Sequence, residues 1–221
     1  MTFDDKIALI RTELKKELPG RKQQFLMAPE FRRSFDFKSP SKNAAIMICL
    51  FPGENDIRIV FIKRTDYDGP HGGQVSFPGG VYEETDTDFS ETAIRETEEE
   101  IGVHCGKSGI LGELTPLLIP VSNMMVHPYV GSFSKNPKFS INQREVSFLI
   151  IAGVSELLNP LSVEKEKWKL HGMEIEVPFY RVDGNIIWGA TAMILSEFLA
   201  VISNSGLYPQ FQYSGNDRTD T

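Results

Sequence analysis

Three glutamates on one predicted helix restrict this chain more than any other feature of its sequence. Glu96, Glu99 and Glu100 are spaced at i, i+3 and i+4, so a helix places them on one face. Like charges on neighbouring turns repel each other and lower the stability of a helix. Such a cluster is tolerated as an acidic face in solvent, or beside cations that neutralise it. Magnesium fits the second setting, because it prefers carboxylate oxygens together with water and phosphate oxygens.

The residues around this cluster predict a helix over Phe89–Ile101. Asp88 precedes it as an N-cap, and Glu91 follows three residues later in the pattern of a capping box. Gly102 has the position of a C-terminal stop. Residues at every fourth position give the helix one face for burial, namely Phe89, Ala93, Thr97 and Ile101.

Apolar runs on both sides of the helix predict β-strands. Residues 44–51 and 57–64 are two such runs joined by the turn-forming sequence PGEND, which predicts a hairpin. Asp183-Gly184 is a two-residue turn signal in front of the strand Asn185–Trp188. We expect further strands at 109–115, 127–133, 145–151 and 174–179, and further helices at 191–203 and Val154–Leu158. Strands interrupted by helices indicate one mixed α/β domain, of the α+β kind.

The first forty residues differ from the rest and predict a helical extension. Residues at three- and four-residue steps form one apolar helix face, namely Phe3, Ile7, Ile10, Leu14 and Leu18. Thr2 can cap the start of this helix, and Pro19-Gly20 stops it. We expect this helix to pack on the main domain or on a partner subunit. A basic stretch follows, which includes Arg21, Lys22, Arg32 and Arg33. We expect these side chains to lie on the solvated surface; the alternative is that they contact an anionic substrate. The expected organisation is an extension over 1–40, a domain over 41–207 and a polar tail over 208–221.

Charge and cysteine content restrict the partners and the compartment. A net charge of −7 argues against a general nucleic-acid binder, whose affinity depends on Lys and Arg facing phosphates. It leaves open a phosphorylated small substrate, since divalent cations supply positive charge. The chain begins with a charged segment unlike a signal peptide and has no apolar stretch near the roughly 20 residues that span a bilayer, so we expect a cytoplasmic protein without a membrane partner. Cys49 and Cys105 predict neither a disulfide nor a structural metal site.

The segment before the acidic helix favours the metal site over the solvated face. Phe77-Pro78-Gly79-Gly80 can turn sharply and bring backbone carbonyls near a bound metal. Together with the helix it resembles the Nudix signature, G-x5-E-x7-R-E-U-x-E-E-x-G-U, in which U is a bulky aliphatic residue. Residues 95–103 match the second half, with Thr97 at an aliphatic position. The first half is one residue longer than the signature, so its early acidic residue is either Asp86 or Asp88.

The extra residue and the preceding segment resemble the coenzyme A pyrophosphatase branch of that family. The branch carries R-S-x5-H-x-G-Q-[VI]-x-F-P-G-G, and this chain has Arg64-Thr65, five residues, and then HGGQVSFPGG. Gly69 stands where the branch has Arg, a departure that bears on coenzyme A recognition and not on hydrolysis. Further matches are VHPYVG at 126–131, Glu145-Val146 and IWGATA at 187–192, so the resemblance covers about 44–202.

The resemblance implies a Nudix α/β/α sandwich, a mixed sheet flanked by helices, here with the N-terminal helical extension. It implies a pyrophosphohydrolase that uses Mg²⁺ or Mn²⁺ to cleave the diphosphate of a nucleoside diphosphate linked to another moiety. Coenzyme A and its derivatives are the leading substrates. The alternatives are a Nudix hydrolase acting on ADP-ribose or NADH, and a catalytically silent Nudix-fold regulator that binds nucleotides. Family habit also suggests a homodimer through the N-terminal helix or an edge strand.

The same resemblance assigns roles to individual residues. The metal ligands it implies are Glu96, Glu99, Glu100 and the carbonyl of Gly80. Arg95 would orient the glutamates, and the general base would be Glu99 or the loop residue Glu145, for which a surface role at a strand start is the alternative. Substrate contacts are expected from Arg64, His71 and Gln74, each with packing or turn formation as its alternative. Trp188 and Met124-Met125 are expected in the core rather than as a platform for a nucleotide base.

Overall fold

The central hairpin of the fold consists of β1 (Lys42–Pro52) and β2 (Ile57–Arg64). The computed structural model describes residues 1–30, 32, 39–66, 72–170 and 172–208. The two strands are antiparallel, with Leu50 opposite Ile59 and Pro52 opposite Ile57. The hairpin predicted from the two apolar runs is therefore confirmed, with β1 two residues longer at its start and one at its end.

A mixed sheet of eight strands is built around β1. β7 (Met124–Ser132) runs parallel to β1, from Lys42 opposite Met124 to Leu50 opposite Ser132. The other pairs are antiparallel. β5 (Ile110–Glu113) and β6 (Leu117–Ile119) pair with β7. β3 (Val75–Ser76) and β8 (Val146–Gly153) pair with β2, and β4 (Gly79–Val81) pairs with β1.

The edge of β1 opposite β7 has two different partners. Its last residues pair with β2, whereas Ala44–Ile46 pairs with β4. The chain passes from β3 to β4 through Phe77 and Pro78 alone, and the N–H of Met47 donates to the carbonyl of Pro78 at 2.9 Å. Gly79 follows with φ of +150°, and a Cβ there would lie 2.3 Å from the carbonyl oxygen of Ala45. The change of partner strand therefore requires glycine at this corner.

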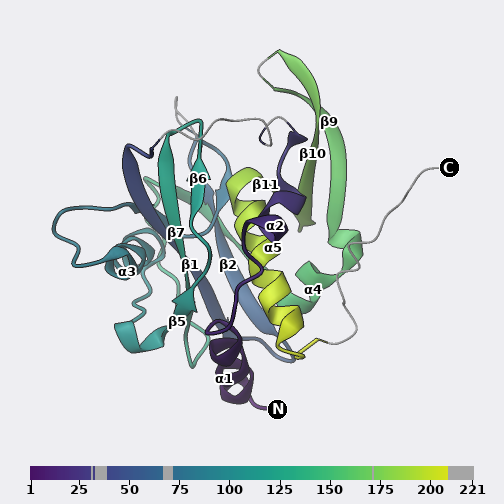
Figure 1. Cartoon of the computed structure of the whole chain (residues 1–221). Coiled ribbons are helices and arrows are strands. Elements are labelled where there is room, and N and C mark those ends of the chain that lie inside the picture. The colour runs from purple at the N-terminus through teal and green to yellow at the C-terminus, as the bar shows by residue number, and fades with distance from the viewer. Residues whose placement is uncertain (31, 33–38, 67–71, 171, 209–221) are drawn as a thin grey trace.

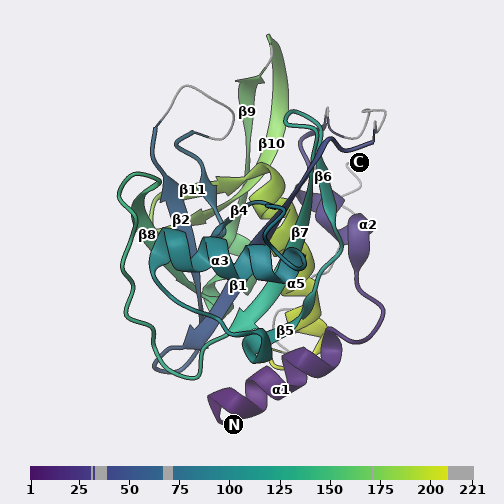
Figure 2. The same cartoon turned by 90° about the vertical axis from the view of Figure 1, so that its left-hand side faces the viewer.

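Helices cover both faces of the sheet, with α3 (Phe89–Ile101) on one side and α5 (Gly189–Asn204) on the other (Figures 1 and 2). Alternate side chains of β1 pack toward α3, namely Ala45, Met47, Cys49 and Phe51. Those between them belong to the core under α5, namely Ala44, Ile48 and Leu50. Burial on both faces explains why β1 is a continuous apolar run. The predicted α/β/α sandwich is confirmed, and α3 has the predicted bounds.

A smaller antiparallel sheet follows the main one along the chain. It contains β9 (Val163–Leu170), β10 (Met173–Val182) and β11 (Asn185–Trp188), with β10 in the middle. The β9–β10 hairpin projects beyond the main sheet (Figure 1). Asp183 and Gly184 both have positive φ, 46° and 75°, which confirms the predicted two-residue turn. β9 was not predicted, because VEKEKWKL has no apolar run.

The remaining helices are short. They are α1 (Phe3–Glu13), α2 (Gly20–Gln24), α4 (Val154–Leu158) and the 3₁₀ turns Phe25–Met27, Lys107–Gly109 and Pro160–Ser162. None of the helices in the described ranges has the length and apolar character needed to cross a membrane.

The N-terminal helix is shorter than the sequence predicted. It begins at Thr2, whose hydroxyl accepts the N–H of Asp5 at 3.2 Å, but it ends with Leu14 as its C-cap instead of continuing to Leu18. The N–H groups of Lys15 and Lys16 donate to carbonyls three residues back, which tightens and closes the last turn. Ile7, Ile10 and Leu14 are buried in the core under α5, so α1 packs on the main sheet's α5 side.

A buried carboxylate on α5 fixes the segment that follows α1. Glu197 is fully buried and accepts the N–H of Gly20 at 3.1 Å and the amide of Gln24 at 2.8 Å. It also accepts the hydroxyl of Thr115 at 2.6 Å. Three hydrogen bonds thus converge on one buried side chain of α5, and two of them hold α2 against that helix.

Replacing Glu197 with Ala should lower the free energy of unfolding by about 3 kcal/mol, because the buried amide of Gln24 and the half-buried donors of Gly20 and Thr115 lose this acceptor. Denaturant titration followed by circular dichroism measures this loss. Glu17→Ala, at an exposed position of the same N-terminal segment, is the control and should change stability by less than about 0.5 kcal/mol. Equal stabilities of the two variants would contradict the anchoring role.

Candidate active site

The acidic helix α3 has well-defined ends. Asp88 Oδ1 accepts the N–H of Glu91 at 3.0 Å, and Gly102 ends the helix in the left-handed conformation with φ of 70°. Both predicted caps are confirmed. The return bond of the predicted capping box differs, because the Glu91 carboxylate accepts the N–H of Thr87 at 2.7 Å rather than that of Asp88. Local capping therefore fixes where the acidic helix begins and ends.

Glu100 is the most deeply buried carboxylate of the cluster. Its side chain is 1% exposed; one oxygen accepts the N–H of Gly79 at 2.8 Å and the other faces Nη1 of Arg64 at 3.3 Å. Burial raises the pKa of Glu100 to about 8, although Arg64 and the Gly79 N–H act in the opposite direction. A nearby cation would stabilise the charged form of this group.

Glu96 lies against the backbone of Gly80. A Cβ on Gly80 would come within 2.4 Å of the Glu96 carboxyl carbon, so glycine is required for this close approach. Arg95 Nη1 donates to Glu96 Oε1 at 2.9 Å. Burial nevertheless raises the pKa of Glu96, because the Arg95 contact only partly compensates for lost hydration.

Arg95 connects the helix to the loop in front of it. Its Nε and Nη2 donate to the two oxygens of Asp86 at 2.9 and 3.0 Å, and Nη2 also reaches the carbonyl of Val81 at 3.1 Å. This fork holds the pKa of the buried Asp86 down at about 2, and a hydrogen bond from Thr92 at 2.8 Å adds to the effect. The two acidic residues that the sequence left open thus have different places: Asp86 faces Arg95, and Asp88 caps the helix.

Glu99 and Glu145 are the two solvent-accessible carboxylates of the site. The Glu99 side chain is 55% exposed and lies 3.5 Å from Nη1 of Arg95. Glu145 belongs to a turn anchored on α3, because Asn142 donates its N–H to the carbonyl of Glu100 at 2.9 Å and accepts that of Glu145 at 3.0 Å. The charge of Glu145 contributes to the raised pKa values of Glu96 and Glu100, which places it within electrostatic range of both.

The donor set suits a metal that keeps part of its shell for water and phosphate. Across the described ranges, no three His, Cys, Asp or Glu side chains form a closed ligand cluster. Glu96 and Glu100 offer two hard carboxylates at the Gly80 corner, and burial raises the pKa of both, so a cation beside them would favour their charged forms. Mg²⁺ is held in this way, by one or two carboxylates together with water and substrate phosphates.

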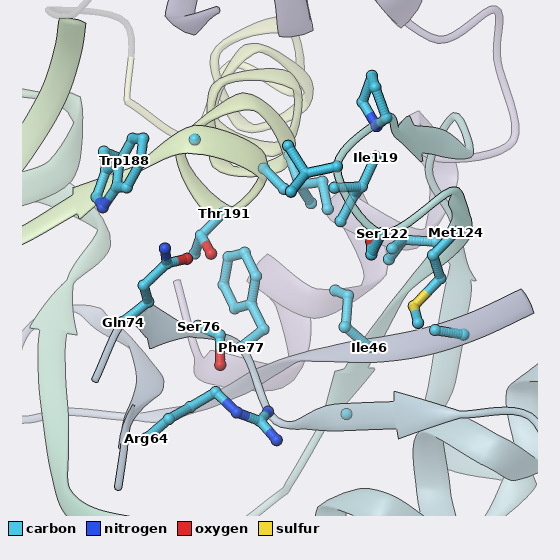
Figure 3. A pocket seen from close by; sticks show the side chains of 18 of the residues that line it. Ile46, Arg64, Gln74, Ser76, Phe77, Ile119, Ser122, Met124, Trp188 and Thr191 are labelled. Carbon is cyan, nitrogen blue, oxygen red and sulfur yellow. The ribbon is translucent and has the colours of Figure 1, made fainter. Parts of the chain in front are cut away.

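A cavity of about 590 Å³ borders the Gly79-Gly80 corner (Figure 3). Arg64 and Gln74, two of the predicted substrate contacts, line it, while the third, His71, lies outside the described residues. Trp188 and Met124 are half-buried and also line the cavity, and Met124 packs against the hydrophobic core as predicted. They come from β11 and from the start of β7, which face each other across the open space rather than packing together (Figure 3).

Arg32 was predicted as solvated surface, and that prediction is wrong. It is 7% exposed, lines the cavity and donates from Nη2 to the carbonyl of Leu118 at 2.6 Å. Ser76 and Ser122 line the cavity too; the sequence offered Ser76 as a phosphate contact with packing as the alternative, and it did not single out Ser122. No periodicity marks these three residues, because their burial depends on strands distant in the sequence.

Comparison with known proteins gives consistent matches. A family model for the NUDIX domain matches residues 41–175. The chain is 35% identical over 161 residues to "Nudix hydrolase 15, mitochondrial" of Arabidopsis thaliana, covering 70% of this chain and 56% of that protein. It is 33% identical over 164 residues to "Uncharacterized Nudix hydrolase NudL" of Yersinia enterocolitica, covering 72% of this chain and 80% of that protein. The chain thus spans just over half the length of the plant relative.

One crystal structure supports the same fold. It is that of a MutT/nudix family protein from Enterococcus faecalis, with a TM-score of 0.51 and 14% identity, and the match covers 92% of this chain and 75% of the other. Identity at this level shows the fold alone.

Replacing Asp86 with Asn should lower the free energy of unfolding at pH 7 by about 2 kcal/mol, the equivalent of its lowered pKa. The folded pKa lies below the unfolded one, so this stabilisation is complete above about pH 4 and disappears as pH falls toward 2. Urea titrations of both proteins between pH 7 and pH 3 measure the difference. Glu84→Gln, in the same loop and exposed, is the control; a difference independent of pH would refute the ion-pair explanation.

Proposed function

The chain belongs to the Nudix family, and on that basis we propose that it is a Mg²⁺- or Mn²⁺-dependent pyrophosphohydrolase. Its substrate is a nucleoside diphosphate linked to another moiety, and coenzyme A and its derivatives are the leading candidates. The observation that carries the proposal is Glu100, a carboxylate buried against the Gly79 N–H at the corner of a substrate-sized cavity. A raised pKa in such a place is typical of a functional group rather than of a structural one.

Glu96 and Glu100 would hold the metal, with the carbonyl of Gly80 and the exposed Glu99 completing the protein's share. The bound metal would neutralise charge on the diphosphate and lower the pKa of a water molecule. Arg95 does not reach the cavity lining; its contacts with Asp86 and Glu96 support a role in orienting the glutamates. Arg64 lines the cavity and pairs with Glu100, so it is suited to contact the diphosphate.

The reaction needs a base that removes a proton from the attacking water. The water oxygen bonds to one phosphorus, the bridging P–O bond breaks, and the proton passes to a carboxylate. Glu145 is our candidate, because it is exposed and within electrostatic range of Glu96 and Glu100. Glu99 is the alternative; it is also exposed, but it is partly engaged by Arg95.

The cavity suits a substrate with an apolar or aromatic part next to its phosphates. Its walls are mostly apolar, with Ile46, Phe77 and Trp188 among them, while Arg64 and Gln74 add polar contacts on one side (Figure 3). This pattern supports a nucleotide base or an extended acyl-carrying arm beside the diphosphate. His71 stays a candidate through the family resemblance alone, and Gly69 leaves ADP-ribose and NADH as the rival substrates.

The assembly and the compartment remain predictions. A cytoplasmic location and a homodimer are expectations from the sequence and from family habit. Two Arabidopsis relatives carry the words mitochondrial and chloroplastic in their names. The expected partner is a small nucleotide-diphosphate compound rather than a nucleic acid.

Replacing Glu100 with Gln should reduce Mg²⁺-dependent turnover by at least about 100-fold, because a neutral amide is a poor ligand for a hard cation. The fold should persist, since the amide oxygen can still accept the Gly79 N–H. The assay is product chromatography with coenzyme A, ADP-ribose, NADH and diadenosine polyphosphates, together with thermal denaturation of both proteins. Full activity of the variant would refute Glu100 as a ligand. Binding without turnover of any compound by the unmodified protein would support the regulator instead.

The base is identified by comparing Glu145→Gln with Glu99→Gln. In the variant that lacks the true base, kcat should fall about 100- to 10,000-fold, and the acidic limb of the pH–rate profile should disappear. We expect this for Glu145 and a smaller loss for Glu99. Glu98→Gln, at an exposed position on the same helix, is the matched control and should leave kcat unchanged. A lost acidic limb in the Glu99 variant alone would transfer the role to Glu99.

A further inference from the structure

One guanidinium group in the cavity, that of Arg32, has no carboxylate partner among the described residues. Arg32 is 7% exposed, and its hydrogen bond in the described structure is the one from Nη2 to the carbonyl of Leu118. It forms no ion pair with any described residue. Burial lowers the pKa of Arg32 to about 10, so the group remains charged at neutral pH. A buried charge without a partner is costly, which makes a bound anion its natural complement.

Arg32 and Arg64 lie at different ends of the cavity. Arg32 is bonded to Leu118, the neighbour of Ile119, and Figure 3 shows Ile119 across the cavity from Arg64. Apolar side chains such as Ile46 and Phe77 lie between the two ends (Figure 3). Arg64 marks the end of the cavity next to the acidic helix, because its Nη1 lies 3.3 Å from Oε1 of Glu100. The cavity therefore has two cationic ends separated by an apolar wall.

An unsatisfied hydroxyl accompanies each cationic end. The Oγ atoms of Ser76 and Ser122 are buried and have no hydrogen-bond partner within the described part of the chain. Both residues line the cavity, and Figure 3 places Ser76 above Arg64 and Ser122 beside Ile119. Phosphate oxygens accept hydrogen bonds from guanidinium and hydroxyl groups together, and charge-assisted bonds of this kind are strong. Each end thus has the donors that an anionic group requires.

We propose that Arg32 and Ser122 bind a second phosphate of the substrate, at the end of the cavity remote from the diphosphate. This inference rests on the proposed function, which places the diphosphate at the Arg64 end beside Glu100. The substrate class is a nucleoside diphosphate compound whose nucleoside carries an additional phosphomonoester. The 3′-phosphate of coenzyme A and the 2′-phosphate of NADPH have this chemistry, whereas NADH and ADP-ribose lack it.

Binding of small nucleotides tests the site without turnover. Calorimetric titrations compare adenosine 3′,5′-bisphosphate, adenosine 2′,5′-bisphosphate and AMP, using the full chain and its Arg32→Gln, Ser122→Ala and Arg58→Gln variants. The unmodified protein should bind one bisphosphate about 10- to 100-fold more tightly than AMP, the range for a charged hydrogen bond. The preferred isomer identifies the position of the phosphate. Arg32→Gln should abolish the preference and change AMP affinity by less than about threefold.

The other variants keep the inference falsifiable. Ser122→Ala should weaken bisphosphate binding several-fold, and it decides the matter if Arg32→Gln does not fold. Arg58→Gln is the matched control, because Arg58 belongs to β2 but does not line the cavity. Equal binding of AMP and both bisphosphates by the unmodified protein would overturn the proposal. So would a preference that persists in Arg32→Gln.

Hydrolysis separates this inference from the proposed function. In the unmodified protein kcat/KM should be at least about tenfold higher for coenzyme A than for its 3′-dephospho form, or for NADPH than for NADH. Arg32→Gln should remove that ratio. If no compound is hydrolysed while Arg32-dependent binding persists, the proposed hydrolysis fails and the phosphate site stands. If all compounds are hydrolysed at similar rates with and without Arg32, the phosphate site fails and the hydrolase stands.

Discussion

The hydrogen bond between the Gly79 N–H and the buried Glu100 carboxylate joins the fold to the site. A carboxylate in the interior must be hydrogen-bonded, and this donor is available only where the chain changes its partner from β2 to β1. The second contact of Glu100 comes from Arg64, the last residue of β2. The position of the carboxylate therefore depends on the central hairpin, the glycine corner and α3 together. Disruption of any of the three would move the Glu100 carboxylate.

The carboxylates near this contact are of two kinds, which differ in how far neighbouring groups neutralise their negative charge. Asp86 is fully engaged by the fork of Arg95, which lowers its pKa, so its negative charge is satisfied by the protein. Burial raises the pKa values of Glu96 and Glu100, because Arg95 and Arg64 compensate only partly for lost hydration. Arg95 thus fixes the loop to the helix, while Glu96 and Glu100 lie where a bound cation would stabilise their charged forms. This division explains why acidic repulsion on α3 is compatible with a stable fold.

Local signals made much of this structure predictable. The bounds of α3 follow from Asp88 and Gly102, which act within one turn of the chain, and the Asp183-Gly184 turn follows from the two residues themselves. Strands β3 and β4 have two and three residues and exist through their partners, so no sequence window contains their signal. β9 is stabilised by cross-strand pairs such as Lys165 with Glu176, and its charged sequence resembles a solvated loop. Arg32 sits in a basic stretch, and its burial depends on a carbonyl 86 residues further along the chain.

The cavity is lined by residues from inside and from outside the region that matches the family model. Gly80, Glu96 and Glu100 fall inside the region of residues 41–175 that matches the family model. Arg32 precedes that region, and Trp188 and Thr191 follow it, although all three line the same cavity. Glu197 ties α2 to α5 and so couples the two flanking segments to each other rather than to α3. Both flanking segments thus contribute to the cavity together with the matched region, so under the proposed function substitutions at Arg32, Trp188 or Thr191 can alter substrate choice while the Glu100 contact stays intact.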